Sequence, residues 1–447
     1  MKPPPAAPVN NTAPIPSTLF HPGALRFWLA VTLTGIGTGI AAALLTMLLE
    51  AVQRFFWGGS GRDILSTASH ATPLRHILVL LGAGVATGLG QIALRQLSSG
   101  NGIDTSAAIW FHAGRLPALR TLGSAALSVI IVGMGVSLGR EGAPKQAGAV
   151  FGNFFSDLGR LSDEQRRLLV ACGAGAGMSA AYGVPLGGAL FALEVMRGVL
   201  ALRYVLPAIF ASLVATAVSW IALPDAPTYL IPAYKSSASC IVWVLLAGPV
   251  AGIVSVGYVR AVTWAYRTKP KGWKRIVAPV GGLGILGLIT IYFPQILGNG
   301  KDISQLAFTG NVSAALLALL LLLKPAAILL SMVCGAPGGL FTPSLTLGAL
   351  LGGVLGFAWS FLWPGVPAGL FAFLGAGAVL AATTQGPIST VVLLMELTGR
   401  DRSFILPLLL VVAAATLVAR SIEPRSVYDA QLTDEEFAER QKIRQSG

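Results

Sequence analysis

The chain has 447 residues, of which 54% are hydrophobic and only 11% are charged. Because average soluble proteins carry roughly 25% charged residues, this composition excludes an ordinary soluble globular protein and indicates an all-α integral membrane protein. The net charge of +13 does not predict a nucleic-acid partner, since the basic residues gather in no soluble domain or stripe.

The two ends of the chain are polar. Residues 1–24 begin with a Pro-rich stretch, and we expect them to be disordered. No short apolar core with a cleavage site follows, so we expect no removed signal peptide. Residues 424–447 carry Tyr428 and a short charged tail, and we expect no regulatory domain there.

Apolar runs fill nearly all of the chain between these ends. Several are long enough for the roughly 20 residues that a membrane-spanning helix needs. Two apolar stretches, 146–158 and 387–398, are too short to cross alone, which predicts tilted, broken or re-entrant helices buried among the others. The longer runs are 25–52, 77–94, 121–137, 167–203, 204–222, 239–265, 276–293, 312–333, 344–380 and 403–421.

The densest basic group is RAVTWAYRTKPKGWKR at 260–275, which lies between two apolar runs and is expected to be a loop. By the positive-inside rule, this loop and the basic tail after Arg420 face the cytoplasm.

Several motifs occur twice, in the same order and at a nearly constant offset. They divide the chain into two half-repeats, 25–222 and 239–423, joined by a connecting loop at 223–238. The N-terminus precedes the first long helix of the first half, whereas the cytoplasmic basic loop follows the first long helix of the second half. If the N-terminus is also cytoplasmic, these two equivalent helices cross the membrane in opposite directions, which favours an inverted repeat. The matched pairs are GNGID at Gly100 with GNGKD at Gly298, GREGAPKQAGAVFG at Gly139 with GLFTPSLTLGALLG at Gly339, GAGAGMSAAYGVP at Gly173 with GAGAVLAATTQGP at Gly375, and Pro185 to Glu194 with Pro387 to Glu396.

Three glycine-rich breaks, GNGID, GREGAP and GGLFTP, precede apolar stretches. Glycine permits tight bends and leaves backbone N–H groups uncovered, and such donors at a helix N-terminus bind anions. Converging breaks would form an anion site in mid-membrane, with Gly102, Gly142 and Gly339 as candidate anion-binding residues. The alternative is that these glycines only permit close helix packing.

Glu141 follows Arg140 at the second break, and an ionisable residue within a membrane is functional by default. A carboxylate beside an anion site can occupy that site, or take a proton and leave it. Glu141 is therefore the candidate for coupling anion movement to proton movement. The alternative is a salt bridge with Arg140, but adjacent residues on a helix do not face each other well.

Other ionisable residues predict mainly structural roles. Glu194 and Glu396 each lie near a helix end and an arginine, which favours pairing or capping. Asp104 and Asp302 recur in the repeated GNG motif, and each is expected to make a short-range bond to the backbone. Lys324, in LLLKPAAILL, is expected to snorkel or to add positive potential to an anion route.

No metal or cofactor is expected. Cys172, Cys240 and Cys334 lie in or beside apolar runs without ligand spacing, so they are interpreted as buried free thiols. The four histidines do not cluster, and the phosphate-loop, dinucleotide and zinc-protease motifs are absent or incomplete. A membrane-embedded enzyme, the rival from another class, would need a paired acid/base or metal constellation that is absent from the sequence.

The motifs resemble signatures of the CLC family of chloride channels and anion/proton antiporters, over residues 25–432. GREGAPKQ is similar to the GREGPxxQ signature, GGLFTP to GxFxP, and RSVYDAQL to the segment with the anion-contacting tyrosine. The resemblance implies a homodimer of inverted-repeat subunits, each with its own anion path and with Glu141 as the gating, proton-exchanging glutamate. The implied anion contacts are Asn101, the backbone amides of Leu340 and Phe341, and the Tyr428 hydroxyl.

The departures from the family pattern bear on the substrate. Asn101 stands where chloride-type members have serine, and Ala143 and Asp104 stand where they have proline. Val195 replaces the inner proton glutamate, as in chloride channels and in the fluoride-exporting branch. Asparagine offers two amide donors where serine offers one, which suits strongly hydrated fluoride.

We therefore expect a fluoride/proton antiporter that exports F⁻ across a bacterial inner (plasma) membrane, using the inward proton gradient. Because Val195 cannot relay protons, the inner route would need water, Glu141 itself or polar groups such as Thr342. The alternatives are a chloride/proton antiporter and a passive chloride channel of the same fold. The expected partners are fluoride or chloride, protons, the lipid bilayer and a second copy of the chain.

Overall fold

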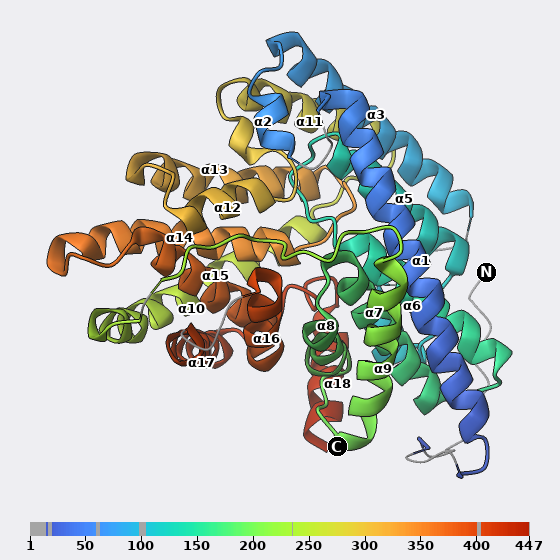
Figure 1. Ribbon diagram of the computed structural model, residues 1–447. Helices are drawn as coiled ribbons and strands as arrows, with labels where there is room; N and C mark the ends of the chain where they lie inside the picture. The colour runs from blue at the N-terminus through green and yellow to red at the C-terminus, as the bar shows by residue number, and fades with distance from the viewer. Residues whose placement is uncertain are drawn as a thin grey trace.

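A computed structural model describes residues 15–16, 20–59, 63–97, 104–234, 236–399 and 404–446. Within these residues the regular secondary structure is helical, as expected for the all-α class (Figure 1). Two of the predicted anion-binding residues, Asn101 and Gly102, lie outside the described residues, as does most of the predicted disordered segment 1–24.

The helices of the first half are α1 (Ala24–Trp57), α2 (Ile64–Ala68), α3 (Pro73–Gln96), α4 (Thr105–Phe111), α5 (Ala118–Gly133), α6 (Gly142–Leu158), α7 (Asp163–Tyr182), α8 (Pro185–Phe191), the π-helical turn η1 (Ala192–Arg197) and α9 (Leu202–Ser219). The helices of the second half are α10 (Ala238–Arg267), α11 (Lys274–Tyr292), the 3₁₀ turn η2 (Pro294–Ile296), α12 (Lys301–Thr309), α13 (Ala314–Val333), α14 (Phe341–Leu362), α15 (Ala368–Thr384), α16 (Pro387–Thr398) and α17 (Ile405–Ile422). Helix α18 (Asp434–Ser446) follows both halves.

Eight of the described helices are long and apolar enough to cross a membrane, namely α1, α3, α9, α10, α11, α13, α14 and α17. The two short stretches of the sequence form α6 and α16, whose residues are mostly buried against other helices. A helix too short to span a bilayer must be surrounded by protein, because its ends carry unpaired backbone groups.

The basic segment at 260–275 is mostly helical, and the prediction of a loop there was wrong. Helix α10 continues through Arg267 and α11 begins at Lys274, so the connection is confined to residues 268–273. Arg260 and Arg267 lie on the last turns of α10 and form ion pairs with Glu423 and Asp434.

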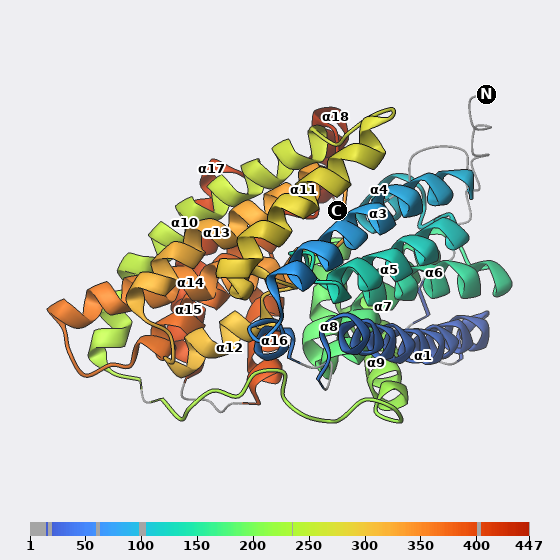
Figure 2. The same cartoon turned by 90° about the horizontal axis from the view of Figure 1, so that it is seen from above.

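The two halves lie side by side, one coloured blue to green and the other yellow-green to red (Figures 1 and 2). Equivalent helices pack alike in each half: α1 packs on α9 as α10 packs on α17, and α6 packs on α7 as α14 packs on α15. Helix α3 of the first half also packs along α11 of the second, and one cluster of buried apolar side chains contains residues of both halves.

The same glycine crossing occurs in both halves. A Cβ atom built on Gly148 in α6 would overlap the carbonyl oxygen of Gly173 in α7. In the second half, a Cβ atom on Gly348 in α14 would overlap the carbonyl oxygen of Gly375 in α15. These are the glycines that the sequence repeat aligns, and at these positions they serve close helix packing.

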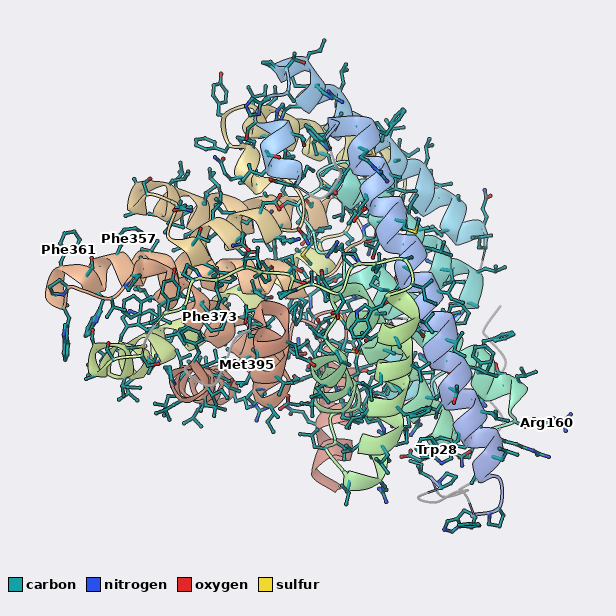
Figure 3. The ribbon with its side chains drawn as sticks, viewed as in Figure 1. Trp28, Arg160, Phe357, Phe361, Phe373 and Met395 are labelled. Atoms are coloured by element: carbon teal, nitrogen blue, oxygen red, sulfur yellow. The ribbon has the colours of Figure 1, made fainter. Side chains whose placement is uncertain are left out.

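Helices α6 and α14 begin at one place in the middle of the molecule and run apart. Their preceding breaks are joined by an antiparallel backbone pair between Gly139 and Gly339. The divergence of the two helices is visible in Figure 3. Arg160, just beyond α6, and Phe361, near the end of α14, lie at opposite edges of the structure. Equivalent helices that meet at their N-termini have opposite directions, as the predicted inverted repeat requires.

Glu194 and Glu396 cap helices of the opposite half. The Glu194 carboxylate accepts hydrogen bonds from the N–H groups of Ile388 (3.1 Å) and Ser389 (2.6 Å) at the start of α16. The Glu396 carboxylate accepts from the N–H groups of Leu186 (3.0 Å) and Gly187 (2.7 Å) at the start of α8. Each carboxylate satisfies donors that helical bonding leaves unpaired.

The prediction of pairing or capping for these two glutamates is thus confirmed, in the form of capping. Arg197 forms its ion pair with Glu164 of α7, at 2.7 Å. Glu194 and Arg197 both lie on η1.

The second GNG motif has a structural role. The Lys301 N–H donates to the Asn299 side chain at 3.2 Å, and Gly298 and Gly300 have positive φ angles of 61° and 92°. Lys324 is buried and does not snorkel, because its ammonium donates to the carbonyls of Ile296, Leu297 and Gly298, at 2.8, 3.4 and 2.8 Å. The lysine is needed because this turn exposes several carbonyl oxygens in the interior.

The two repeated aspartates differ. Asp104 makes the expected short-range bond, accepting from the Ser106 N–H at 2.9 Å at the start of α4. Asp302 instead accepts from the Leu65 N–H at 3.1 Å, which ties α12 to α2 of the other half. The prediction of a short-range bond is therefore confirmed for Asp104 and wrong for Asp302.

Replacing Gly148 by alanine should lower the thermal midpoint of the purified protein in detergent, because the new methyl group overpacks the crossing of α6 and α7, at a cost of about 1–3 kcal/mol. The matched control is Gly257→Ala in α10, where a built Cβ meets no atom within 4 Å. This control should leave the midpoint unchanged or raise it. Equal midpoints for the two variants would contradict the close crossing.

Replacing Glu396 by alanine should also lower this midpoint, because the first donors of α8 lose their acceptor, a loss of about 0.5–2 kcal/mol. Glu194→Ala should lower it similarly through α16. Glu439→Ala, an exposed carboxylate on α18, is the control. A control as destabilised as the two cap variants would argue against specific capping.

Candidate anion site

The site lies where the breaks before α6 and α14 meet. The Gly139 N–H donates to the Gly339 carbonyl and the Gly339 N–H donates to the Gly139 carbonyl, both at 2.8 Å. A Cβ atom on Gly142 would lie 3.0 Å from the Gly339 nitrogen, so a side chain there would press on the opposite backbone. Glycines therefore bring the first turns of two helices within contact of each other.

Glu141 precedes α6 but bonds to the start of α14. Its Oε1 atom accepts from the N–H groups of Phe341 at 2.6 Å and Thr342 at 3.2 Å. Its Oε2 atom accepts from the Thr342 hydroxyl at 3.1 Å and the Tyr182 hydroxyl at 3.5 Å. The carboxylate is 2% exposed, so it is held in the interior by neutral donors alone.

This geometry is that of an anion site occupied by the protein's own carboxylate. Two backbone N–H groups and a helix N-terminus supply partial positive charge, and neither α6 nor α14 has an acidic residue in its first turn. A free anion can use the same donors if the carboxylate leaves, and a protonated Glu141 is a weaker competitor for them.

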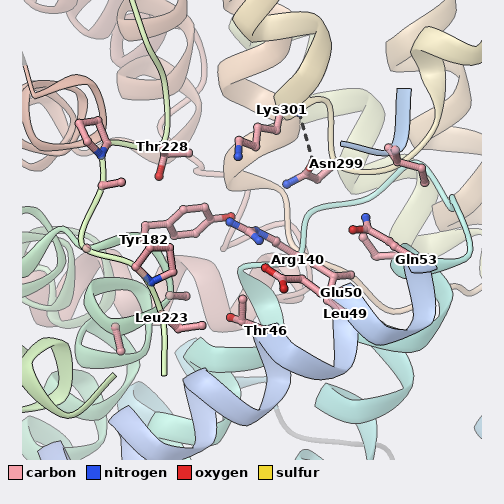
Figure 4. Close-up of a pocket in the computed structure, with 18 of the residues that line it drawn as sticks. Thr46, Leu49, Glu50, Gln53, Arg140, Tyr182, Leu223, Thr228, Asn299 and Lys301 are labelled. Atoms are coloured by element: carbon pink, nitrogen blue, oxygen red, sulfur yellow. Dashed lines mark hydrogen bonds between the residues drawn. The ribbon is translucent and has the colours of Figure 1, made fainter. Parts of the chain in front are cut away.

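The alternative of a salt bridge between Glu141 and Arg140 is wrong for the described residues. The Arg140 guanidinium lies over the Tyr182 ring, 4.9 Å from its centroid. Arg140 lines a cavity (Figure 4). The Glu141 carboxylate instead contacts the start of α14.

The predicted site residues that the structure describes fall into two groups, one at the junction and the other consisting of Tyr428. Gly142, Gly339, Leu340 and Phe341 lie together with Glu141 at the junction. Of the two amides expected to serve the site, the one from Phe341 donates to Glu141, and its companion comes from Thr342 rather than Leu340.

Tyr428 lies beyond an aromatic side chain from α8. The Phe191 ring packs edge-on against Phe341, with centroids 6.4 Å apart, and against Tyr428, with centroids 5.5 Å apart. The ammonium of Lys145, a residue of α6, lies over the Tyr428 ring, 4.5 Å from its centroid. A continuous row of side chains therefore leads from Glu141 to Tyr428 and Lys145.

Val195 lies on η1 and is 3% exposed. Its carbonyl accepts from the Arg440 guanidinium of α18 at 3.4 Å, and Arg440 also forms an ion pair with Asp429. The Arg440 guanidinium lies 4.8 Å from the Trp110 ring centroid. The position that carries an inner glutamate in the resembled exchangers is thus an apolar side chain beside a paired arginine.

Two cavities approach the junction from different sides. One, of about 250 Å³, includes Arg140 and Tyr182, and also Glu50, Asn299 and Lys301 (Figure 4). The lining of this cavity carries both signs of charge. Tyr182 connects it to Glu141 through the hydroxyl contact described above.

The other cavity, of about 490 Å³, reaches Leu138 and Gly338, next to the Gly139–Gly339 pair. Its lining is strongly basic and has Asp104 as its acidic member among the described residues. Such a surface raises the local concentration of anions. The basic members are Arg95, Arg120, Arg267, Lys269, Lys271 and Arg275.

Tyr182, Lys145 and the Arg440–Asp429 pair were not predicted from the sequence. Tyr182 sits in a small-residue segment without a distinctive pattern, and the partners of Arg440 are far from it in the chain. Lys145 was detectable as a charged residue inside the GREGAPKQ motif, by the rule that singled out Glu141.

The described residues contain no group of three or more His, Cys, Asp or Glu side chains that could hold a metal ion. Cys172, Cys240 and Cys334 are buried and free, as expected.

Comparisons with known proteins agree with the fold and the motifs. The chain is 33% identical over 316 residues to the H(+)/Cl(-) exchange transporter ClcA of Vibrio parahaemolyticus serotype O3:K6, a match that covers 67% of each chain. It is 34% identical over 315 residues to the transporter of the same name from Yersinia pestis bv. Antiqua, which covers 67% of this chain and 65% of that protein. These matches span about two thirds of the relatives' own length.

Solved structures share the fold. A slow cyanobacterial Cl⁻/H⁺ antiporter superposes with a TM-score of 0.80 at 21% identity, covering 96% of this chain and all of that one. A CLC-type fluoride/proton antiporter superposes with a TM-score of 0.73 at 22% identity, covering 91% of this chain and 98% of that one. At these identities the likeness extends to the fold alone.

Residues 83–420 match the family described as voltage gated chloride channel. Together with the eight apolar helices, this match identifies a multi-pass membrane protein. The chain therefore belongs to the voltage gated chloride channel family, the CLC family that its motifs resemble.

Proposed function

We propose that the chain exchanges chloride for protons across a bacterial inner membrane, with Glu141 alternating between the anion site and a protonated position. The observation that carries the proposal is the seating of the Glu141 carboxylate on the Phe341 and Thr342 donors. A buried carboxylate held by neutral donors competes directly with a mobile anion for the same site.

The mechanism depends on the two states of the Glu141 side chain, ionised on the α14 donors or protonated and away from them. When Glu141 takes a proton from the cavity that Arg140 and Tyr182 line, it loses its charge and releases the α14 donors to an anion. When the anion leaves toward the side from which the proton came, the carboxylate releases its proton toward the opposite side and returns to the donors. The movements of anion and proton are then coupled in opposite directions through one side chain.

The proton route on the inner side has no carboxylate at Val195. In the proposed mechanism, water and the hydroxyl of Thr342 relay the proton to Glu141, because this hydroxyl already contacts the carboxylate. The Val195 side chain is apolar and offers no group that could carry a proton, which disfavours a route through that position.

Chloride is the anion that the relatives favour, since the curated matches above are named as H(+)/Cl(-) exchangers. Fluoride, the first expectation from the sequence, is retained as the second candidate. It rests on Asn101, which lies outside the described residues, and a fluoride/proton antiporter shares the fold. A passive chloride channel is the third, because Val195 is shared with channels.

The homodimer is likewise proposed from the family resemblance. The proposed homodimer can be tested by measuring the mass of the detergent-solubilised particle. A monomer that transports at the native rate would contradict the proposal.

Glu141→Gln should abolish proton coupling while chloride still crosses, because glutamine has nearly the same shape but cannot bind and release a proton. In vesicles loaded with chloride, we expect anion-driven proton uptake to fall by roughly 100-fold or more. Glu439→Gln, which removes an exposed carboxylate of α18, is the control and should keep the native rate. Undiminished proton uptake in the Glu141 variant would refute this role, and chloride flux without proton uptake in the native chain would indicate a channel.

The same vesicles distinguish the two halides. We expect chloride to drive proton uptake at least as fast as fluoride in the native chain. A fluoride rate more than about tenfold higher, equivalent to about 1.4 kcal/mol of discrimination, would replace chloride by fluoride in the proposal. In that case Asn101→Ser should shift the preference toward chloride, since serine offers one donor fewer.

A further inference from the structure

The strongly basic cavity of about 490 Å³ collects its positive charges from both halves of the chain. Arg95 and Arg267 lie on the last turns of α3 and α10. Arg120 and Arg275 lie on the first turns of α5 and α11. Two lysines from the connection at 268–273 complete the basic lining. Four helices and one connection therefore direct positive charge toward a single space.

Some of these positive charges have no carboxylate beside them. Arg267 forms an ion pair with Asp434. Within the part of the chain that the structure describes, Arg95 and Arg275 form no ion pair, and the Arg95 guanidinium is repelled by those of Arg275 and Arg120. Like charges gathered around one space cost free energy until an anion lies between them.

Two of the arginines occupy positions where a positive charge is unfavourable. The first turn of a helix carries partial positive charge from its unpaired N–H groups, so it normally attracts acidic residues. Arg120 and Arg275 lie on such turns, and neither turn has an acidic residue. Arg120 is also only 9% exposed, unlike the solvated charges that the positive-inside rule places in loops. Membrane topology alone therefore does not account for these arginines.

The chemistry of the lining suits phosphate groups. Arginine binds a phosphate through two parallel N–H groups, and basic cavities between the cytoplasmic ends of membrane helices bind lipid headgroups that carry phosphates. Thr121, Ser124 and Gln146 add neutral hydrogen-bonding groups to the lining. Trp264 and Trp273, near the two ends of the connection, are 57% and 70% exposed, as tryptophans are at the depth of the headgroups.

We propose that this cavity binds a ligand with two phosphate groups, which is either the headgroup of a phospholipid or a soluble diphosphate, and that the bound ligand slows transport. Arg95 and Arg275 hold the phosphates from the two halves of the chain. Several adjacent arginines match a multivalent anion better than a single halide, because each phosphate accepts from more than one guanidinium.

The effect on transport follows from where the cavity ends. A Cβ atom on Gly338 would lie 2.5 Å from the Leu138 Cβ atom, so the inner wall is tightly packed beside the Gly139–Gly339 pair. A ligand with two phosphates fills the space next to this junction and keeps halide out of it. This part of the inference rests on the proposed function, whereas the binding of the ligand does not.

The first test is calorimetric titration of sodium pyrophosphate into the purified protein in detergent. Arg95→Gln combined with Arg275→Gln removes two charged contacts, so we expect the dissociation constant to rise at least ~100-fold. Arg26→Gln combined with Arg203→Gln removes the same charge from exposed positions outside the cavity and should bind as the native chain does. Equal dissociation constants for the two double variants would overturn the inference.

A second measurement guards against misfolding. Arg95→Gln alone changes an exposed side chain, so its thermal midpoint without ligand should match that of the native chain. Saturating pyrophosphate should raise the midpoint of the native chain, because a ligand of the folded state stabilises it. The increase should be smaller in Arg95→Gln, and an equal increase in both proteins argues against the cavity as the binding site.

Transport in vesicles distinguishes the two sources of the phosphates. Chloride flux and chloride-driven proton uptake are measured in phosphatidylcholine vesicles, with pyrophosphate on both sides or with cardiolipin, whose headgroup carries two phosphates. Phosphatidylglycerol at equal total charge is the control for the lipid. Slower flux with cardiolipin assigns a lipid ligand, and slower flux with pyrophosphate assigns a soluble one, provided that Arg95→Gln with Arg275→Gln abolishes the effect. Native flux that neither compound slows contradicts the proposed regulation.

Failure of the inference and failure of the proposed function give different results. Pyrophosphate binding through Arg95 and Arg275, in a chain that moves chloride without protons, contradicts the antiport and supports the phosphate site. Coupled exchange in a chain whose two double variants bind pyrophosphate equally contradicts the phosphate site and supports the antiport.

Discussion

The backbone N–H groups at the start of a helix need an acceptor, and inside a bilayer there is no bulk water to provide one. The structure depends on this constraint at the junction of α6 and α14. Two equivalent helices begin there, joined by the Gly139–Gly339 pair, and the Glu141 carboxylate accepts from the first donors of α14. Because the acceptor is a side chain, it can be exchanged for an ion. The same requirement that makes the site stable when closed makes it attractive to an anion when open.

The features that the sequence predicts correctly are those that cost free energy in a membrane. Glycine breaks and a carboxylate in an apolar setting are rare enough to be noticed, and the duplication places Gly148 and Gly348 at equivalent crossings. Glu141 was selected as a candidate site residue in this way. Such signals are local, so they are visible in a single chain.

The features that were not predicted depend on partners distant in the chain. No pattern shows that Lys324 would bind carbonyls of the preceding turn, or that Asp302 would reach Leu65 in the other half. The sequence does not indicate a role for the hydroxyl groups of Tyr182 and Thr342 either, because only their position beside Glu141 distinguishes them from other hydroxyl groups. The identity of the transported anion could not be predicted for a similar reason. Halides differ in size and hydration, and discrimination between them depends on donor positions that motifs do not specify.

The reciprocal caps of Glu194 and Glu396 have a consequence for biosynthesis. Helix α8 is made early, but the carboxylate that accepts from Leu186 follows 210 residues later in the chain. At about 5–20 residues per second, a ribosome needs on the order of 10–40 s to supply it. During that interval the first half is in the membrane with the start of α8 uncapped, and it cannot reach its final packing alone. The nascent first half is therefore a substrate for quality control until the second half arrives, and a truncated chain would carry the same defect permanently.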